Sequence, residues 1–245
     1  KEGQIEGGYV HDVEAGLHRG GAILDFKSMY PSIMIGKNIC YTTRIDEGST
    51  DQPDEAEQVH ESPTGARFRN ENGRRGMVPT LLEDLMSQRD VHKAGMREAK
   101  DESKRSYHDQ MQYAVKILMN SFYGVFASGF YRFTHRQLGE SITAWARKNI
   151  KTIIHKLGDE GQHVVYSDTD SIFVKTPVDG VEDPKQAMID FGHSTAERFS
   201  EASAELEFET GMSVFFSHGA KKRYVGQVVW PKEVMMVKGY ETQRT

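Results

Sequence analysis

The sequence has little cysteine, no long apolar run and no excess of basic residues. Its single cysteine, Cys40, excludes an intramolecular disulfide framework and a cysteine-based zinc site. No apolar run approaches the ~20 residues that a membrane-spanning helix needs, and no signal peptide opens the chain. The formal net charge of -5 argues against a surface that is basic throughout, so any contact with nucleic acid must be local. These absences predict an intracellular protein, in cytoplasm or nucleoid if the source is archaeal or bacterial.

The composition is that of a globular protein. The 245 residues are 37% hydrophobic and 27% charged, which is enough to bury a core in one large domain or two small ones. The sequence contains no internal repeat and no low-complexity tract. Because it begins at Lys1 without a methionine and ends abruptly at Arg244-Thr245, we expect it to be a piece of a longer protein.

Local patterns predict an α+β fold. Asp46 to Arg75 is polar and rich in Gly, Pro, Asp and Glu, which predicts a long surface loop or an insertion. The helical pattern from Thr80 to Tyr123, ending at Gly124, predicts two helices in an antiparallel hairpin. We further expect strands at 22–26, 162–166, 172–175, 203–216 and 223–237, a short helix after 26, and helices at 137–157 and after Pro184.

Two aspartates lie within a strongly β-forming stretch. In YSDTDSIFV, residues 166–174, Asp168 and Asp170 occupy the predicted tip of a hairpin. One interpretation is an ordinary hydrophilic β-turn, because Asp is a good turn residue. The other is a site for a divalent cation, because carboxylate oxygens are the ligands that Mg²⁺ prefers. This motif by itself does not decide between the two.

A third aspartate is a candidate partner for this pair. Asp25 ends a predicted strand whose other residues are apolar, and a carboxylate there is costly unless it is paired or binds a metal. Since Asp25 lies far from Asp168 along the chain, only the fold can bring the two together. Three carboxylates could hold two Mg²⁺ ions for phosphoryl transfer.

Basic residues follow one face of the predicted hairpin. Arg89, Lys93 and Arg97 recur at four-residue steps and so stack on one face, while Lys116, Asn120 and Tyr123 share a stripe of the next helix. Such a face is either ordinary solvated surface or a binding site for a polyphosphate. The spacing leaves both interpretations open.

Several motifs together resemble those of the family B DNA polymerases, and the archaeal members most. DFKSMYPSI (25–33), KILMNSFYG (116–124) and YSDTDS (166–171) resemble motifs A, B and C of that family, in the same order. KKRY (221–224) resembles its later lysine-rich motif, and KGYETQR (238–244) resembles the segment that leads into the thumb. The resemblance therefore covers nearly the whole chain.

The resemblance implies a polymerase palm, an antiparallel sheet backed by helices, with an inserted helical-hairpin fingers subdomain. Residues 1–78 would form the N-terminal part of the palm with motif A, and residues 79–125 the fingers with motif B. Residues 126–245 would form the rest of the palm, ending at the junction with the thumb. The motifs of a proofreading exonuclease, and most of a thumb, are absent from this sequence.

The resemblance also implies roles for individual residues. Asp25 and Asp170 would be the principal ligands of two Mg²⁺ ions, with Mn²⁺ as an alternative, and Asp168 would have a weaker or indirect role. The incoming nucleotide would be bound by Arg89, Lys93, Lys116 and Asn120, with Tyr30 under the sugar. Pro31 is expected to restrict Tyr30 to an extended backbone. The primer-template would be bound by Lys221, Lys222, Arg223 and Tyr224.

The sequence departs from the family pattern at two places. Ile5-Glu6-Gly7-Gly8 stands where the family often has Tyr-x-Gly-Gly, and Ser167 stands where glycine is common. Glu207 and Glu209 are both candidates for a further acidic residue near the metals, and the sequence does not choose between them.

The function implied is template-directed DNA synthesis from deoxynucleoside triphosphates on primer-template DNA, with a sliding clamp as a further partner through regions outside this chain. A second hypothesis is a catalytically inactive relative that binds DNA or serves as a scaffold. A nucleotide cyclase or reverse transcriptase with a palm-like fold is a third, and neither explains KILMNSFYG together with KKRY.

Overall fold

The computed structural model describes residues 5–54, 57–201 and 204–240, which divide into two compact units. We call residues 8–27 and 146–240 the sheet unit, and residues 5–7 and 28–145 the hairpin unit, each without the undescribed residues. The helices are α1 (Met29–Gly36), α2 (Met77–Glu98), α3 (Glu102–Ala127), α4 (Arg136–Asp159), which crosses the unit boundary, and α5 (Pro184–Phe199). Within the described residues, none of these helices has the length and apolarity to cross a membrane.

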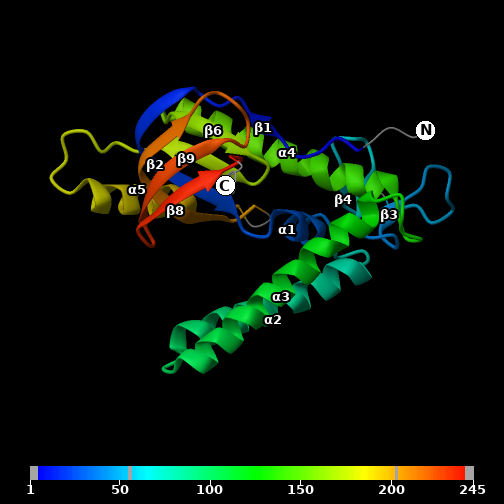
Figure 1. Ribbon diagram of the computed structural model, residues 1–245. Coiled ribbons are helices and arrows are strands. Elements are labelled where there is room, and N and C mark those ends of the chain that lie inside the picture. The colour runs from blue at the N-terminus through cyan, green and yellow to red at the C-terminus, as the bar shows by residue number, and fades with distance from the viewer. Residues whose placement is uncertain (1–4, 55–56, 202–203, 241–245) are drawn as a thin grey trace. The chain divides into compact units, whose positions relative to one another are not determined.

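The sheet unit contains a seven-stranded antiparallel sheet in the order β1-β6-β7-β2-β8-β9-β10 (Figure 1). The strands are β1 (Val10–His11), β2 (Gly16–Phe26), β6 (Val164–Asp168), β7 (Ser171–Lys175), β8 (Leu206–Ser217), β9 (Tyr224–Trp230) and β10 (Val234–Lys238). Strand β2, at the centre, pairs with β7 on one side and with β8 on the other. The predicted strand at 22–26 is therefore the end of a longer one.

Helix α5 packs against one face of this sheet, which confirms the predicted sheet backed by helices. Phe208 of β8 is buried on that face, where His193 of α5 meets its ring edge-on at 5.1 Å between centroids. Leu24 pairs with Phe208 in the sheet and is fully buried. Since side chains alternate along a strand, Ile23 and Asp25 point to the opposite face.

An apolar cluster covers that opposite face. It contains Ile23, Val165, Tyr166, Phe173, Met212, Phe215 and Val228, with Tyr224 packed against it. The rings of Tyr166 and Phe173 lie 5.2 Å apart, and Tyr224 meets Phe173 edge-on at the same distance. Aromatic pairs at these separations add stability beyond the area that they bury.

Tyr166 also connects this cluster to the turn that precedes β9. Its side chain is fully buried, and its hydroxyl oxygen accepts a hydrogen bond of 2.8 Å from the backbone N–H of Lys222. Burial is the main cause that raises the pKa of Tyr166 to about 12, and the charge of Asp168 adds to it. The phenol is therefore held in its neutral form.

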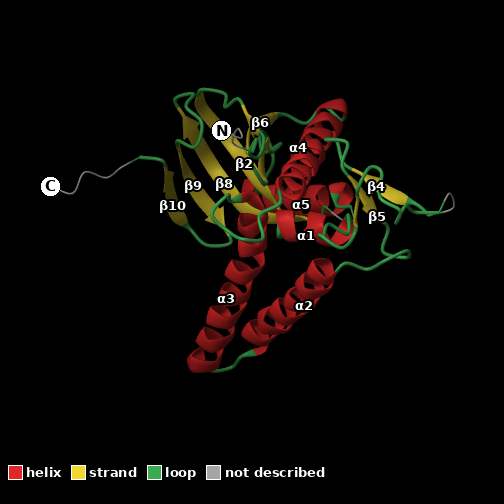
Figure 2. Ribbon diagram, turned by 90° about the vertical axis from the view of Figure 1, so that its right-hand side faces the viewer, coloured by secondary structure: helices red, strands yellow, loops and turns green. Residues whose placement is uncertain are grey.

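The hairpin unit contains the predicted antiparallel helices. Helices α2 and α3 run side by side in both views and are joined by residues 99–101 (Figures 1 and 2). Asp101 caps α3, its carboxylate accepting from the N–H of Lys104 at 2.9 Å. The helix does not end at Gly124 as predicted but continues to Ala127. Phe126 explains this, because it is buried and meets the ring of Tyr41 edge-on at 5.2 Å.

The described residues of the segment 46–75 do not form one continuous loop. A second, three-stranded sheet forms from β3 (Arg44–Ile45), β5 (Arg67–Arg69) and β4 (Val59–Glu61). Phe68 is fully buried, with its ring 5.9 Å from that of Trp145. Arg69 is 9% exposed and forms ion pairs of 2.7 Å with Asp51 and Glu57. Composition could not reveal these pairs, because the partners are distant in sequence.

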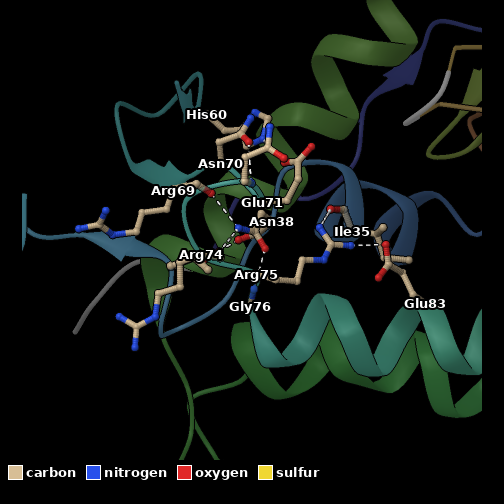
Figure 3. A network of polar contacts seen from close by, with 12 residues as sticks. Ile35, Asn38, His60, Arg69, Asn70, Glu71, Arg74, Arg75, Gly76 and Glu83 are labelled. Atoms are coloured by element: carbon tan, nitrogen blue, oxygen red, sulfur yellow. Dashed lines mark hydrogen bonds and ion pairs between the residues drawn. The ribbon is translucent and has the colours of Figure 1, made fainter. Parts of the chain in front are cut away.

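A buried asparagine connects this second sheet to the start of α2 (Figure 3). The side-chain amide of Asn38 donates to the carbonyl oxygens of Arg69, at 2.8 Å, and Arg74, at 2.7 Å. Its oxygen accepts from the N–H of Gly76, the residue before α2, at 2.9 Å. Because Asn38 is fully buried, these bonds satisfy groups that would otherwise be costly.

Replacing Tyr166 by Phe should lower the urea midpoint of the sheet unit at pH 7. The change leaves the Lys222 N–H without this acceptor, which costs about 1–3 kcal/mol. The folded pKa of Tyr166 exceeds the ordinary value of 10, so its stabilisation is complete below pH 10 and is lost as the pH rises toward 12. The difference between wild type and variant should therefore narrow over that range. A difference that stays constant from pH 8 to pH 12 would contradict this.

Candidate active site

A row of acidic residues crosses the sheet unit at the end of β2. Asp25 pairs with Ser171 of β7 on one side and with Glu207 of β8 on the other, and Ser171 also pairs with Asp168 of β6. Directly opposite residues share a face of a sheet, so Asp168, Asp25 and Glu207 point to the side opposite α5. Neighbouring strands lie about 4.8 Å apart, which places the backbones of Asp25 and Asp168 about 10 Å from each other.

Asp170 lies in the turn that joins β6 and β7. Asp168 and Ser171 form the closing pair of the hairpin, so the loop contains only Thr169 and Asp170. The loop is shorter than predicted, because Ser167 and Asp168 belong to strand β6. The carbonyl oxygen of Asp170 accepts from the N–H of Phe26 at 2.8 Å. This bond joins the turn directly to the end of β2, and the fold therefore brings together all three predicted aspartates.

The turn contains a strained residue. Thr169 has a φ of 57°, which is unfavourable for a β-branched residue. Its N–H donates to the carbonyl of Tyr9 at 2.9 Å, and its hydroxyl donates to Asp168 at 3.1 Å. A Cβ atom at Gly8 would lie 2.8 Å from the methyl carbon of Thr169. The second glycine of the Ile5-Glu6-Gly7-Gly8 segment thus allows the chain to pass against this turn.

Asp168 has an ammonium group and a hydroxyl group as partners. The ammonium nitrogen of Lys222 lies 3.3 Å from Oδ1 of Asp168, and the Thr169 hydroxyl donates to the same oxygen. Asp170 is exposed and Asp25 half-buried. The indirect role that the resemblance implied for Asp168 stays a prediction.

The acidic row fits a hard cation that also takes ligands from a substrate. Among the described residues, no three His, Cys, Asp or Glu side chains come together as a complete protein cage for a metal ion. Mg²⁺ does not need such a cage, because one or two carboxylates together with waters and substrate phosphates commonly hold it. Asp25 and Glu207 lie directly opposite each other on the adjacent strands β2 and β8, which brings two carboxylates together on one face of the sheet.

The register also distinguishes the two candidate glutamates. Glu207 pairs with Asp25, whereas the register shifts between Ile23 and Leu24 and leaves Glu209 as the extra residue of a bulge. Both side chains are exposed. Sequence reasoning could name both glutamates but could not choose, since the bulge becomes visible only once β2 and β8 are paired.

The KKRY segment lies next to the acidic row. Lys221 forms an ion pair of 3.1 Å with Asp12, and Lys222 has a φ of 63° and contacts Asp168. The side chains of Lys221, Lys222 and Arg223 are exposed. Tyr224, by contrast, packs in the apolar cluster, where burial raises its pKa above the ordinary value for tyrosine. Three members of the segment are therefore at the surface, and Tyr224 is partly buried against the core.

The predicted phosphate-binding residues lie in the hairpin unit. Arg89 is 9% exposed, and its guanidinium donates to the hydroxyl of Ser28 at 3.1 Å and to Gln112 of α3 at 3.3 Å. Lys93 is half-buried, while Lys116 and Asn120 are exposed one turn apart on α3. The residues of the predicted basic face are therefore not equally exposed. The first of them, Arg89, is buried and joins α2 to α3 and to Ser28, the residue before α1.

Tyr30 lies in the first turn of α1, so the predicted extended backbone is wrong. Pro31 is the third residue of this helix, where its missing N–H has no intrahelical partner to lose. The ring of Tyr30 packs on that of Tyr123 of α3, with centroids 4.5 Å apart. This contact joins motif A to motif B within the hairpin unit.

The whole chain matches one family model. Residues 1–245 match the model described as DNA polymerase family B. The motifs that carried the resemblance thus lie within a match that extends from end to end.

Individual relatives agree with this match. The chain is 35% identical over 242 residues to a DNA polymerase of Desulfurococcus sp. (strain Tok), covering 97% of this chain and 29% of that protein. It is 34% identical over 238 residues to the DNA polymerase delta catalytic subunit of Caenorhabditis elegans, covering 91% of this chain and 22% of that protein. Archaeal relatives, expected from the motifs, therefore occur beside eukaryotic ones of similar identity.

A solved structure supports the same assignment. The family B DNA polymerase of Pyrobaculum calidifontis superposes with a TM-score of 0.71 and 26% sequence identity, over 98% of this chain and 29% of that protein. The chain thus spans between a fifth and a third of the length of these relatives. On the match of its full length, the chain belongs to the family B DNA polymerases.

Proposed function

We propose that the protein containing this chain is a DNA-directed DNA polymerase that adds deoxynucleotides to a primer 3′-hydroxyl. Family membership supports this, and the observation that carries it is the acidic row at the end of β2, adjoining the Asp168–Asp170 turn. In the reaction, a bond forms between the primer 3′-oxygen and the α-phosphorus. The bond to pyrophosphate breaks, and the pyrophosphate leaves with the electron pair.

Asp25 and Asp170 are the proposed ligands of two Mg²⁺ ions, with Mn²⁺ as an alternative. Glu207 is a further carboxylate opposite Asp25, and Asp168 orients the site through Lys222 and Thr169. When bound, the two ions supply charge stabilisation to the attacking and leaving oxygens. The exposure of Asp170 suits a ligand that shares its cation with a substrate.

Arg89, Lys93 and Lys116 are the proposed partners of the triphosphate, and Asn120 the neighbouring nucleotide contact. Charge-assisted hydrogen bonds from such groups neutralise the charge that moves onto pyrophosphate. Lys116 and Asn120 are exposed on one face of α3 and available to a ligand, whereas Arg89 orders the base of the hairpin. In this assignment α2 and α3 form the fingers within residues 79–125, and residues 1–78 and 126–245 contribute to the palm.

Primer-template DNA is the proposed partner of the KKRY segment. Lys221, Lys222 and Arg223 offer exposed cationic groups beside the acidic row, and Tyr224 anchors them to the apolar cluster. A sliding clamp would bind through regions outside this chain.

A direct test of the whole proposal is primer extension by the full-length protein with one deoxynucleotide omitted at a time. Synthesis should stall where the template calls for the missing nucleotide, and template-independent stalling would refute it.

Replacing Asp25 by Asn in the full-length protein should reduce primer extension by several orders of magnitude. The change removes a charge needed in the transition state, so primer-template affinity should remain nearly unchanged. Extension rates and DNA binding are measured side by side. Asp179→Asn, an exposed change in the segment between β7 and α5, is the matched control and should extend normally. Near-normal turnover of the Asp25 variant in Mg²⁺ would contradict the assignment of Asp25 as a metal ligand.

Replacing Lys116 by Ala should raise the KM for nucleotide and lower kcat. Loss of one charge-assisted phosphate contact costs about 1.5–3 kcal/mol, which corresponds to roughly 10- to 150-fold in kcat/KM. Lys104→Ala, an exposed lysine near the start of the same helix, is the control. If only the affinity for DNA changes, Lys116 does not bind the triphosphate.

Replacing Tyr30 by Ala should increase the incorporation of ribonucleotides far more than it reduces that of deoxynucleotides. The ring is held against Tyr123, so a 2′-hydroxyl would meet a group that cannot retreat without strain. The measurement is kcat/KM for matched ribo- and deoxynucleotides on one template. Tyr30→Phe retains the ring and should retain discrimination. If both rates fall together at a constant ratio, Tyr30 has only a packing role.

A further inference from the structure

Two histidines face each other across the helical hairpin. His92 lies on α2 and His108 on α3, at similar distances along the chain from the connection at 99–101. Their Nδ1 atoms form a hydrogen bond of 3.0 Å, and their rings lie 5.3 Å apart between centroids. Antiparallel helices bring residues on either side of a short turn together, so the pair follows directly from the hairpin.

The two helices leave space for this pair. A Cβ atom at Gly95 would lie 2.6–2.8 Å from three ring atoms of His108, so the absence of a side chain admits the imidazole against α2. Glycine within a helix costs roughly 1 kcal/mol relative to alanine. Tyr107 meets both rings edge-on, at 6.0 Å from His92 and 5.3 Å from His108. Gly95 and Tyr107 thus flank the imidazole of His108, and Tyr107 also contacts that of His92.

The distance between the nitrogens suits a shared metal ion. Imidazole nitrogens bind Zn²⁺ at 2.0–2.1 Å, so two of them in tetrahedral geometry lie about 3.3 Å apart. The observed 3.0 Å is within a few tenths of an ångström of that value. Imidazole also suits Cu²⁺ and Ni²⁺, whereas Mg²⁺ prefers oxygen ligands. The pair is therefore chemically distinct from the acidic row of the sheet unit.

We propose that His92 and His108 form a two-imidazole site for a divalent transition-metal ion of the Zn²⁺ class, which joins α2 to α3. The described residues add no third His, Cys, Asp or Glu ligand, so water fills the other coordination positions. His108 also lines a cavity of about 330 Å³, with Glu98, Lys100, Asp101 and Lys104 around it, which provides room for that water.

The expected consequence is a more stable end of the hairpin. Between residues 90 and 114, all of which the structure describes, no residue is fully buried, so few contacts hold this half of the two helices together. An ion that binds only the folded hairpin stabilises it by mass action. The site is thus a local cross-link between helices and takes no part in the proposed polymerase chemistry.

A Zn²⁺ titration of the chain at pH 7.5 tests the proposal. Histidine side-chain ¹H–¹⁵N resonances of His92 and His108 should shift together and saturate at one ion per chain, while Mg²⁺ should leave them unchanged. Because imidazole binds metal as the neutral base, acidification to pH 5 should release the ion. If Zn²⁺ binds to the chain but leaves both histidine resonances unchanged, the proposal is wrong. This measurement uses the wild-type chain, so it does not depend on whether a variant folds.

Variants measure the contribution of each imidazole. His92→Ala and His108→Ala should each weaken Zn²⁺ binding at least 10-fold. The double variant should lose less binding free energy than the sum of the two single losses, because chelation by the pair is already lost with the first imidazole. His155→Ala removes an exposed imidazole of α4 and should leave this affinity unchanged. If His92→Ala binds Zn²⁺ as tightly as wild type, or if the two single losses add independently, the pair is only a hydrogen-bonded contact.

Discussion

The pairing of β2 with both β7 and β8 is the constraint on which the sheet unit depends. Backbone hydrogen bonds set this register, and alternation of side chains then decides which residues face α5 and which face away. A shift of one residue would turn Asp25 toward the buried side and Leu24 toward the acidic row. Burial of Leu24 and of Phe208, its partner, therefore also orients the aspartate.

The apolar cluster extends this constraint to the lysine-rich turn. Tyr166 belongs to motif C, yet its hydroxyl accepts a hydrogen bond from the backbone of Lys222. Lys222 in turn places its ammonium group beside Asp168, while Tyr224 packs against Tyr166 with centroids 6.1 Å apart. A proposed DNA-binding segment and a proposed catalytic motif are thus held together by one buried phenol. The electrostatic surroundings of Asp168 depend on that packing.

In the hairpin unit, the helices are packed more tightly near their base than near the connection at 99–101. Near its base, Leu82, Val115 and Met119 are buried, and Arg89 connects α2 to α3 and to Ser28. Farther out, the helices rest on the capping by Asp101 and on contacts such as the histidine pair. Elements with few buried contacts open locally at low free-energy cost. The base of the hairpin is therefore held more firmly than its far end.

Much of the fold and the family of this protein could be predicted from the sequence alone. The positions of Asp25, Asp168 and Asp170, the helical hairpin and the family all follow from local patterns and from motifs in order, because residue type and spacing are themselves the signal. The sequence could not show that Glu207 rather than Glu209 lies opposite Asp25, that residues 59–69 join a second sheet, or that Tyr30 is helical. These depend on a bulge, on ion pairs and on packing between segments far apart in the chain. Tertiary structure decided them because strand register and burial are properties of pairs of segments, and no single segment contains them.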